Sequence, residues 1–98
     1  MSKTKTKTKV TAKPNLIRLY RRKRHFKLKD IALLMNQKSS AHISHWEKGR
    51  KMPNLINALK LSAILKCPVE ILFSDLFNSI RNEVFELKKR HNLYERYD

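Results

Sequence analysis

Cationic side chains are the groups whose number and spacing in this sequence point to a particular chemistry. Lys and Arg number 23 against 8 Asp and Glu, which gives a net charge of +15 over 98 residues. The charge is one-sided, because residues 1–51 hold 16 of the cations and only two acids. Such a chain requires a polyanionic partner, and nucleic acid is the usual one because each neutralised phosphate releases a counterion. A ribosome-like basic protein and a membrane-surface protein are the alternatives that the composition leaves open.

Groups that could perform catalysis or hold a metal ion are sparse. Gly49 is the only glycine, which excludes glycine-rich phosphate loops and dinucleotide-binding turns. Cys67 is the only cysteine, which excludes an internal disulfide and multi-cysteine zinc sites and fits a reducing cytosol. His42 and His45 lie three residues apart, but beyond Glu47 no Cys or carboxylate cluster accompanies them. No Ser–His–Asp or paired-carboxylate arrangement has support, so we expect no enzyme, no metal site and no cofactor.

The elements that must position the basic residues are helices. No strand signal is present, so the predicted fold class is all-α. Pro14 and Asn15 supply a start signal for the first helix, and residues 25–27 separate it from the second. The polar stretch 36–40 predicts a turn that ends in Ser40, an N-cap candidate for a third helix.

Three further signals complete a predicted five-helix domain over residues 14–73. Gly49 predicts the end of the third helix, since glycine favours the C′ position. Asn54 is expected to cap a fourth helix and Pro68 to open a short fifth one. Before this domain, residues 1–13 alternate Lys with Thr and contain no aromatic side chain, so we predict a disordered basic arm there.

The last segment, residues 74–98, has an apolar rhythm of its own. Side chains spaced alternately four and three residues apart form an a/d seam, typical of helices that pair: Phe73, Phe77, Ile80, Val84, Leu87, His91 and Tyr94. Two arrangements are open for this helix. It folds back onto the basic half as extra core, or it pairs with its twin in a homodimer through residues 74–97, and we favour the second.

The third predicted helix has a buried and an outward face. Ile43 and Trp46 are expected to face the core, and Ala32 of the second helix must be small because the two helices cross closely above it. The outward face near the start of the third helix then carries four side chains, which are Ser40, Ala41, Ser44 and His45. Two short helices joined by a tight polar turn have a shape that fits the major groove of B-DNA.

Two runs in the sequence resemble the Cro/Xre-type, lambda-repressor-like helix-turn-helix family over roughly residues 15–73. Residues 26–32 (FKLKDIA) are similar to the family's LTQEELA-like run, and residues 43–53 (ISHWEKGRKMP) to its IS-x-WE-x-G-x-x-x-P signature. The resemblance implies a five-helix DNA-binding domain, commonly of a dimeric transcriptional repressor. Lys27 and Leu28 stand where the family often has Ser or Thr and then Gln, whose side-chain amide and backbone N–H contact a phosphate. Only the backbone contact is therefore expected here.

The resemblance also implies roles for particular residues. The matching positions read bases in the family, so the expected base contacts are Ser40, Ala41, Ser44 and His45. Lysines and an arginine around that helix suit phosphate contacts: Lys29, Lys38, Lys48, Arg50 and Lys51. Arg21 and Glu47 occupy positions where the family has a buried or half-buried ion pair, so we expect them to be structural. Asn36 replaces the turn glycine and tolerates a left-handed conformation.

The leading prediction is a sequence-specific regulator of transcription, a repressor, that binds double-stranded DNA as a homodimer. Two other classes remain open: an antitoxin-like protein whose C-terminal helix binds a partner protein, and a sequence-blind basic architectural protein. No apolar run exceeds residues 31–35, so no membrane span is expected. The expected location is cytoplasmic, in a bacterial, phage or mobile-element context that the resemblance implies.

Overall fold

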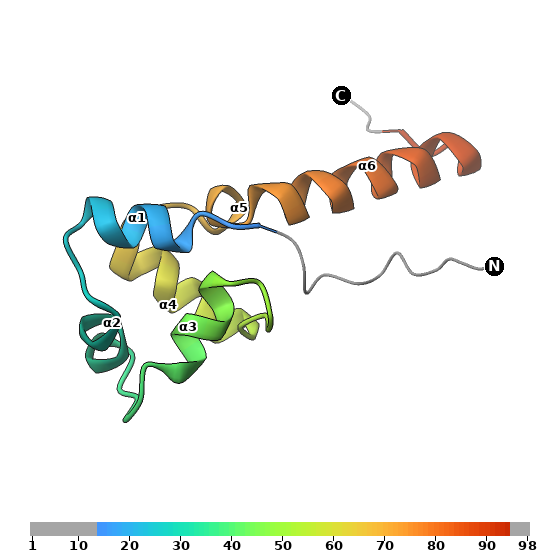
Figure 1. Ribbon diagram of the computed structural model, residues 1–98. Coiled ribbons are helices and arrows are strands. Elements are labelled where there is room, and N and C mark those ends of the chain that lie inside the picture. The colour runs from blue at the N-terminus through green and yellow to red at the C-terminus, as the bar shows by residue number, and fades with distance from the viewer. Residues whose placement is uncertain (1–13, 95–98) are drawn as a thin grey trace.

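The computed structural model describes residues 14–94, and in that range it contains helices and no strand. The all-α prediction is therefore confirmed, and Figure 1 shows five short helices gathered at one end and a sixth that leaves them. The helices are α1 (Ile17–Lys23), α2 (Leu28–Leu34), α3 (Ala41–Glu47), α4 (Leu55–Leu65), α5 (Val69–Leu72) and α6 (Ser74–His91). The predicted basic arm, residues 1–13, and the last residues of the predicted C-terminal segment, 95–98, lie outside the described residues.

One apolar core joins α1 to α5. Its largest fully buried side chains come from every one of these helices: Ile17, Ile31, Ile43, Leu61, Leu65 and Leu72. Burying each such side chain stabilises the fold by about 1.5–3 kcal/mol. Ala32 and Trp46 are also buried, so α2 and α3 approach closely and α3 is held by its Ile43 and Trp46 side.

The turn between α2 and α3 has the two features predicted for it and one further contact. Asn36 has a φ of 58°, the left-handed conformation expected for it. Ser40 occupies the N-cap position of α3, but its side chain makes no capping hydrogen bond. The Ser39 hydroxyl accepts the Ala41 N–H instead, at 3.0 Å. The N-cap position is therefore the predicted one, and the side-chain hydrogen bond at the helix start comes from the residue before it.

Gly49 ends α3 as predicted. Its φ is 72°, its N–H donates to the Trp46 carbonyl at 3.1 Å, and the Arg50 N–H donates to the His45 carbonyl at 3.0 Å. These two bonds satisfy carbonyls that the last turn of a helix otherwise leaves open. A left-handed residue with a Cβ costs about 1–2 kcal/mol, so glycine suits this position.

Replacing Gly49 with Ala is expected to lower the free energy of unfolding by about 1–2 kcal/mol, because a residue with a Cβ must then adopt the left-handed conformation in a buried position. Urea denaturation followed by circular dichroism measures the change. Lys48→Ala, next to it in an exposed right-handed position, is the control and should change stability by less than about 0.5 kcal/mol. An equal loss in both variants would contradict this role for Gly49.

The remaining predicted boundaries also agree with the structure. Asn54 caps α4 by accepting the Asn57 N–H at 2.8 Å, and Pro68 directly precedes α5. Phe73 belongs to the domain core rather than to the apolar seam with which it shares a spacing, because it is 7% exposed and packs with the buried cluster.

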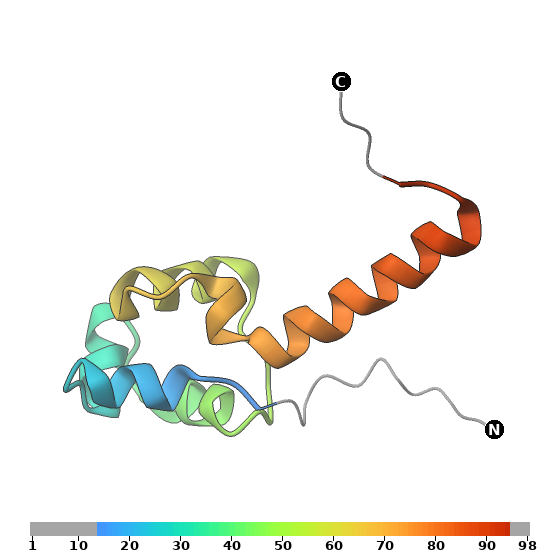
Figure 2. The same cartoon turned by 90° about the horizontal axis from the view of Figure 1, so that it is seen from above.

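The sixth helix, α6, does not fold back onto the basic half. Figures 1 and 2, from two directions, show it running away from the other helices, and none of its residues is buried. The large apolar positions of the predicted seam that lie on α6 are between 41% and 47% exposed, namely Phe77, Ile80, Val84 and Leu87. The last predicted position, Tyr94, is not on the helix as expected, because α6 ends at His91 and Asn92 adopts the left-handed conformation. The chain thus presents an apolar helix face that its own described residues leave uncovered.

Candidate nucleic-acid interface

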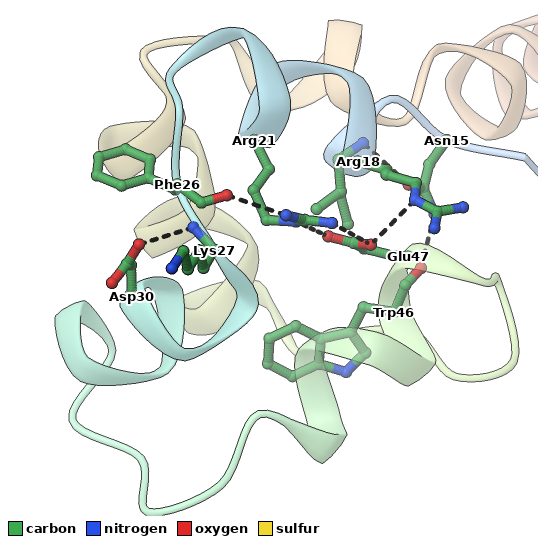
Figure 3. Close-up of polar contacts among 9 residues, drawn as sticks. Asn15, Arg18, Arg21, Phe26, Lys27, Asp30, Trp46 and Glu47 are labelled. Carbon is green, nitrogen blue, oxygen red and sulfur yellow. Dashed lines mark hydrogen bonds and ion pairs between the residues drawn. The ribbon is translucent and has the colours of Figure 1, made fainter.

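A buried ion pair fixes α3 against α1. The Arg21 Nε donates to Glu47 Oε2, and its Nη2 donates to Glu47 Oε1 at 3.3 Å (Figure 3). Both side chains are at most 10% exposed. Arg21 Nη1 also donates to the Phe26 carbonyl at 2.9 Å, in the break before α2. One guanidinium therefore joins α1, the end of α3 and the entry to α2, which restricts how these helices move relative to one another.

Two further residues hold the same end of α3, and neither role was predicted from the sequence. Asn15 Nδ2 donates to the Trp46 carbonyl at 2.8 Å, while its Oδ1 accepts the Ile17 N–H at 3.0 Å (Figure 3). Arg18 Nε lies 4.0 Å from Glu47 Oε1 and remains mostly exposed. Asn15 carried a local signal, a helix start, but no sequence pattern connects it with a carbonyl so distant along the chain.

The four candidate base contacts lie together on the free side of α3. Ala41 is exposed, and Ser40, Ser44 and His45 are half-buried. Within residues 14–94 the side chains of these three polar residues make no hydrogen bond, so their donors and acceptors are available to another molecule. His42 is exposed on the same helix and stacks on Trp46, with ring centroids 6.3 Å apart. His42 was not among the predicted base contacts.

The five candidate phosphate contacts are all exposed. Lys29 is on α2, Lys38 precedes α3, and the others follow α3 at its C-terminal end: Lys48, Arg50 and Lys51. None of the five forms an ion pair with a carboxylate of residues 14–94. The cations at both ends of α3 thus keep their charge uncompensated, as contacts to phosphate oxygens require.

The start of α2 differs in one detail from the expectation for it. Asp30 Oδ2 accepts the Lys27 N–H at 2.7 Å, so that backbone amide is already occupied (Figure 3). Of the two residues that replace the family's usual pair, only Leu28 retains an amide without an acceptor in the described part of the chain. At this position, therefore, only one backbone amide is available to contact a phosphate.

Two other kinds of site, for a metal ion and for a membrane, have no counterpart in the described part of the chain. Across residues 14–94, no group of three or more His, Cys, Asp or Glu side chains is placed to hold a metal ion. No helix in the same range is both long enough and apolar enough to cross a membrane.

This arrangement of helices matches a known protein family. The Helix-turn-helix family model HTH_3 matches residues 17–72, which begin with α1 and end with α5. Neither curated proteins nor solved structures gave a significant match. The match covers more than half of the chain and leaves α6 outside it. The chain belongs to the Cro/Xre-type helix-turn-helix family of DNA-binding transcription regulators.

Proposed function

We propose that this protein represses transcription by binding a specific sequence of double-stranded DNA with the start of α3 in the major groove. The observation that carries the proposal is the contrast between the two sides of α3. One side is fixed by the core and by the Arg21–Glu47 pair, and the other presents polar groups without partners between exposed cations. Direct reading of bases needs both a rigid helix and free hydrogen-bonding groups.

The chemistry of the proposed base contacts is modest. Ser40 and Ser44 can donate or accept, Ala41 can contact a thymine methyl group, and His45 can donate to a guanine acceptor. None of them forms the two-bond contact that Arg makes with guanine or Gln with adenine. Affinity then depends strongly on phosphate contacts, for which we propose Lys29, Lys38, Lys48, Arg50 and Lys51.

Replacing Arg50 with Ala is expected to weaken binding to specific and random duplexes by a similar factor, because a phosphate contact carries no sequence information. The slope of log K against log salt should fall in magnitude by about one. Titrations of labelled duplexes at several salt concentrations measure both quantities. Arg81→Ala, on the helix that leaves the domain, removes the same charge and should leave the slope nearly unchanged. A selective loss on the specific site would reassign Arg50 to base reading.

Homodimerisation through residues 74–97 is part of the proposal. Its support is the apolar face of α6, which stays about half exposed in the single chain. Two domains related by a two-fold axis would bind two half-sites, so the operator is expected to be a two-fold repeat. The proposal includes no catalytic step. On the family resemblance, we place the activity in the cytoplasm of a bacterium, or in a phage or another mobile element.

Selection from a random duplex library at about 150 mM salt, where non-specific affinity is suppressed, tests the proposal. Enrichment of a two-fold motif would support a dimeric reader of sequence. A single unrepeated half-site would keep the reading of DNA and contradict the dimer. No enrichment would contradict base reading and favour a sequence-blind basic protein. In that case, deletion of residues 1–13, which carry five lysines, should remove most of the affinity.

A second candidate function rests on α6 itself. Because this helix lies outside the family match and leaves its apolar face uncovered, it could hold a different protein, as in an antitoxin that binds both a toxin and DNA. A purified chain that stays monomeric at tens of micromolar and pairs only with a host protein would favour this function over the homodimer.

A further inference from the structure

A hydrophobic groove lies where α6 leaves the domain. It has a volume of about 530 Å³ and is open to solvent. Its walls come from the loop before α4, from α4, α5 and the first turns of α6, and include Met52, Leu55, Val69, Glu70, Phe77 and Ile80. Leu55 is 71% exposed, which is unusual for a leucine beside a core. An apolar groove of this kind is expected to be covered in the working protein.

The groove and the apolar seam of α6 are one continuous surface. Phe77 and Ile80 line the groove and are also the first exposed positions of the seam, which continues through Val84 and Leu87 to His91, the last residue of α6. A helix that covers the seam therefore reaches the groove at the domain end. The seam has the four-and-three spacing that lets two α-helices pair along their length.

We propose that the groove receives the far end of α6 from a second copy of this chain, with the two α6 helices antiparallel. This inference rests on the proposed homodimer and specifies its arrangement. Charge favours the antiparallel direction. Residues 69–80, by the groove, carry two acids and no Lys or Arg, while residues 81–94 carry four Lys or Arg and two acids. Antiparallel pairing brings the acidic end of each helix beside the basic end of the other, and parallel pairing would bring like charges together.

The buried position of Phe73 selects the register. In an antiparallel pair, the seam positions Ile80 and Val84 face His91 and Leu87 of the other copy, respectively. This alignment pairs the four seam positions of each chain from Ile80 to His91, where α6 ends. The alignment one step closer would need Phe73 to face His91, but Phe73 is packed in the domain core and is unavailable. The chosen register places His91, the last residue of the second copy's α6, beside Ile80 in the groove wall.

The arrangement leaves the proposed DNA-binding face free. In Figure 1, α3 lies below α1, whereas α6 leaves the domain at the level of α1. A two-fold axis across the middle of the α6 pair would therefore keep both α3 helices away from the contact between the copies. The residues that line the groove include one charged side chain, Glu70, so the strongly basic surface is not buried by the pairing.

Cysteine cross-linking of the full chain tests the inference. In the proposed register, position 80 of one copy faces position 91 of the other, so the double variant Ile80→Cys, His91→Cys should form a covalent dimer on mild oxidation. Each single variant should not, because its two cysteines would be about 16 Å apart along the helices, too far for a disulfide. The unmodified chain is the control, since its one cysteine, Cys67, is buried.

Each outcome has a distinct meaning. Cross-linking of the double variant alone supports the inference. Cross-linking of both single variants means parallel helices, which overturns the inference and leaves the homodimeric regulator intact. A lack of any cross-link, with a monomer mass in sedimentation, overturns both the inference and the homodimer. Selection from random duplexes tests the reading of DNA separately in every case.

A groove variant tests the occupant without cysteine chemistry. Leu55→Asp places a charge on the groove wall at the exposed first position of α4 and should raise the dimer dissociation constant at least tenfold. Leu33→Asp makes the same change at a leucine of α2 that is 75% exposed and lies outside this groove, and it should leave dimerisation unchanged. Equal effects of the two changes would overturn the assignment of the groove.

Discussion

Replacing Arg21 with Met is expected to lower the free energy of unfolding by about 3 kcal/mol, since breaking a buried ion pair typically costs 3–5 kcal/mol. The substitution keeps the bulk of the side chain and removes the guanidinium. The Glu47 carboxylate is then left 7% exposed with only Arg18, 4.0 Å away and mostly in solvent, near it. The Phe26 carbonyl loses its donor as well. The midpoint of urea denaturation should fall by about 2 M.

Two further variants separate this cause from a general sensitivity of α1. Arg22→Met changes the exposed neighbour and should shift stability by less than about 0.5 kcal/mol. Adding Glu47→Leu to Arg21→Met removes the stranded carboxylate, and at least half of the lost stability should return, because an apolar pair of similar size often replaces a buried ion pair without loss. A double variant as unstable as the single one would show that the unpaired carboxylate is not the source of the cost.

Local signals in the sequence predicted most of the fold. Gly49, Asn54 and Asn36 adopt the conformations expected of them, because caps and left-handed turns depend on a few neighbouring residues. The pairing of Arg21 with Glu47, 26 residues apart, was expected only from the family resemblance, since no local pattern links these positions. The hydrogen bond from the Ala41 N–H to the Ser39 hydroxyl was not predicted, because it depends on the path of the chain through the turn.

Exposure was the property that the sequence predicted least well. Leu34, Leu55 and Leu59 follow a helical apolar pattern, yet each is more than half exposed. Periodicity shows which side of a helix is apolar, but it cannot show whether another element covers that side. The reverse holds for Phe73, which has the spacing of the seam and is buried in the domain. These differences depend on how the helices pack against one another, which a local pattern does not specify.

The proposed base contacts were placed on α3 by the same reasoning from periodicity, and their effect on binding is a second large expected result. The double change Ser44→Ala, His45→Ala should lower affinity for the selected operator about 30-fold, because each removes a single hydrogen bond to a base, which contributes about 1 kcal/mol. Affinity for random duplex should fall by no more than about threefold, since the phosphate contacts remain. Anisotropy titrations of both duplexes at one salt concentration measure the two losses, and equal losses would contradict base reading.

His42 provides the matched control for this result, because it lies on the same helix, is exposed and is not among the proposed base contacts. His42→Ala removes a ring that stacks on Trp46 and should cost far less specific affinity than the double change. The unfolding midpoint of each variant shows whether α3 remains folded. If His42→Ala caused the larger specific loss, α3 would present a neighbouring face to the bases, about 60° round the helix from His45, since three residues turn it by about 300°. The dimer proposed above would then have to hold the two domains at a different angle to the DNA.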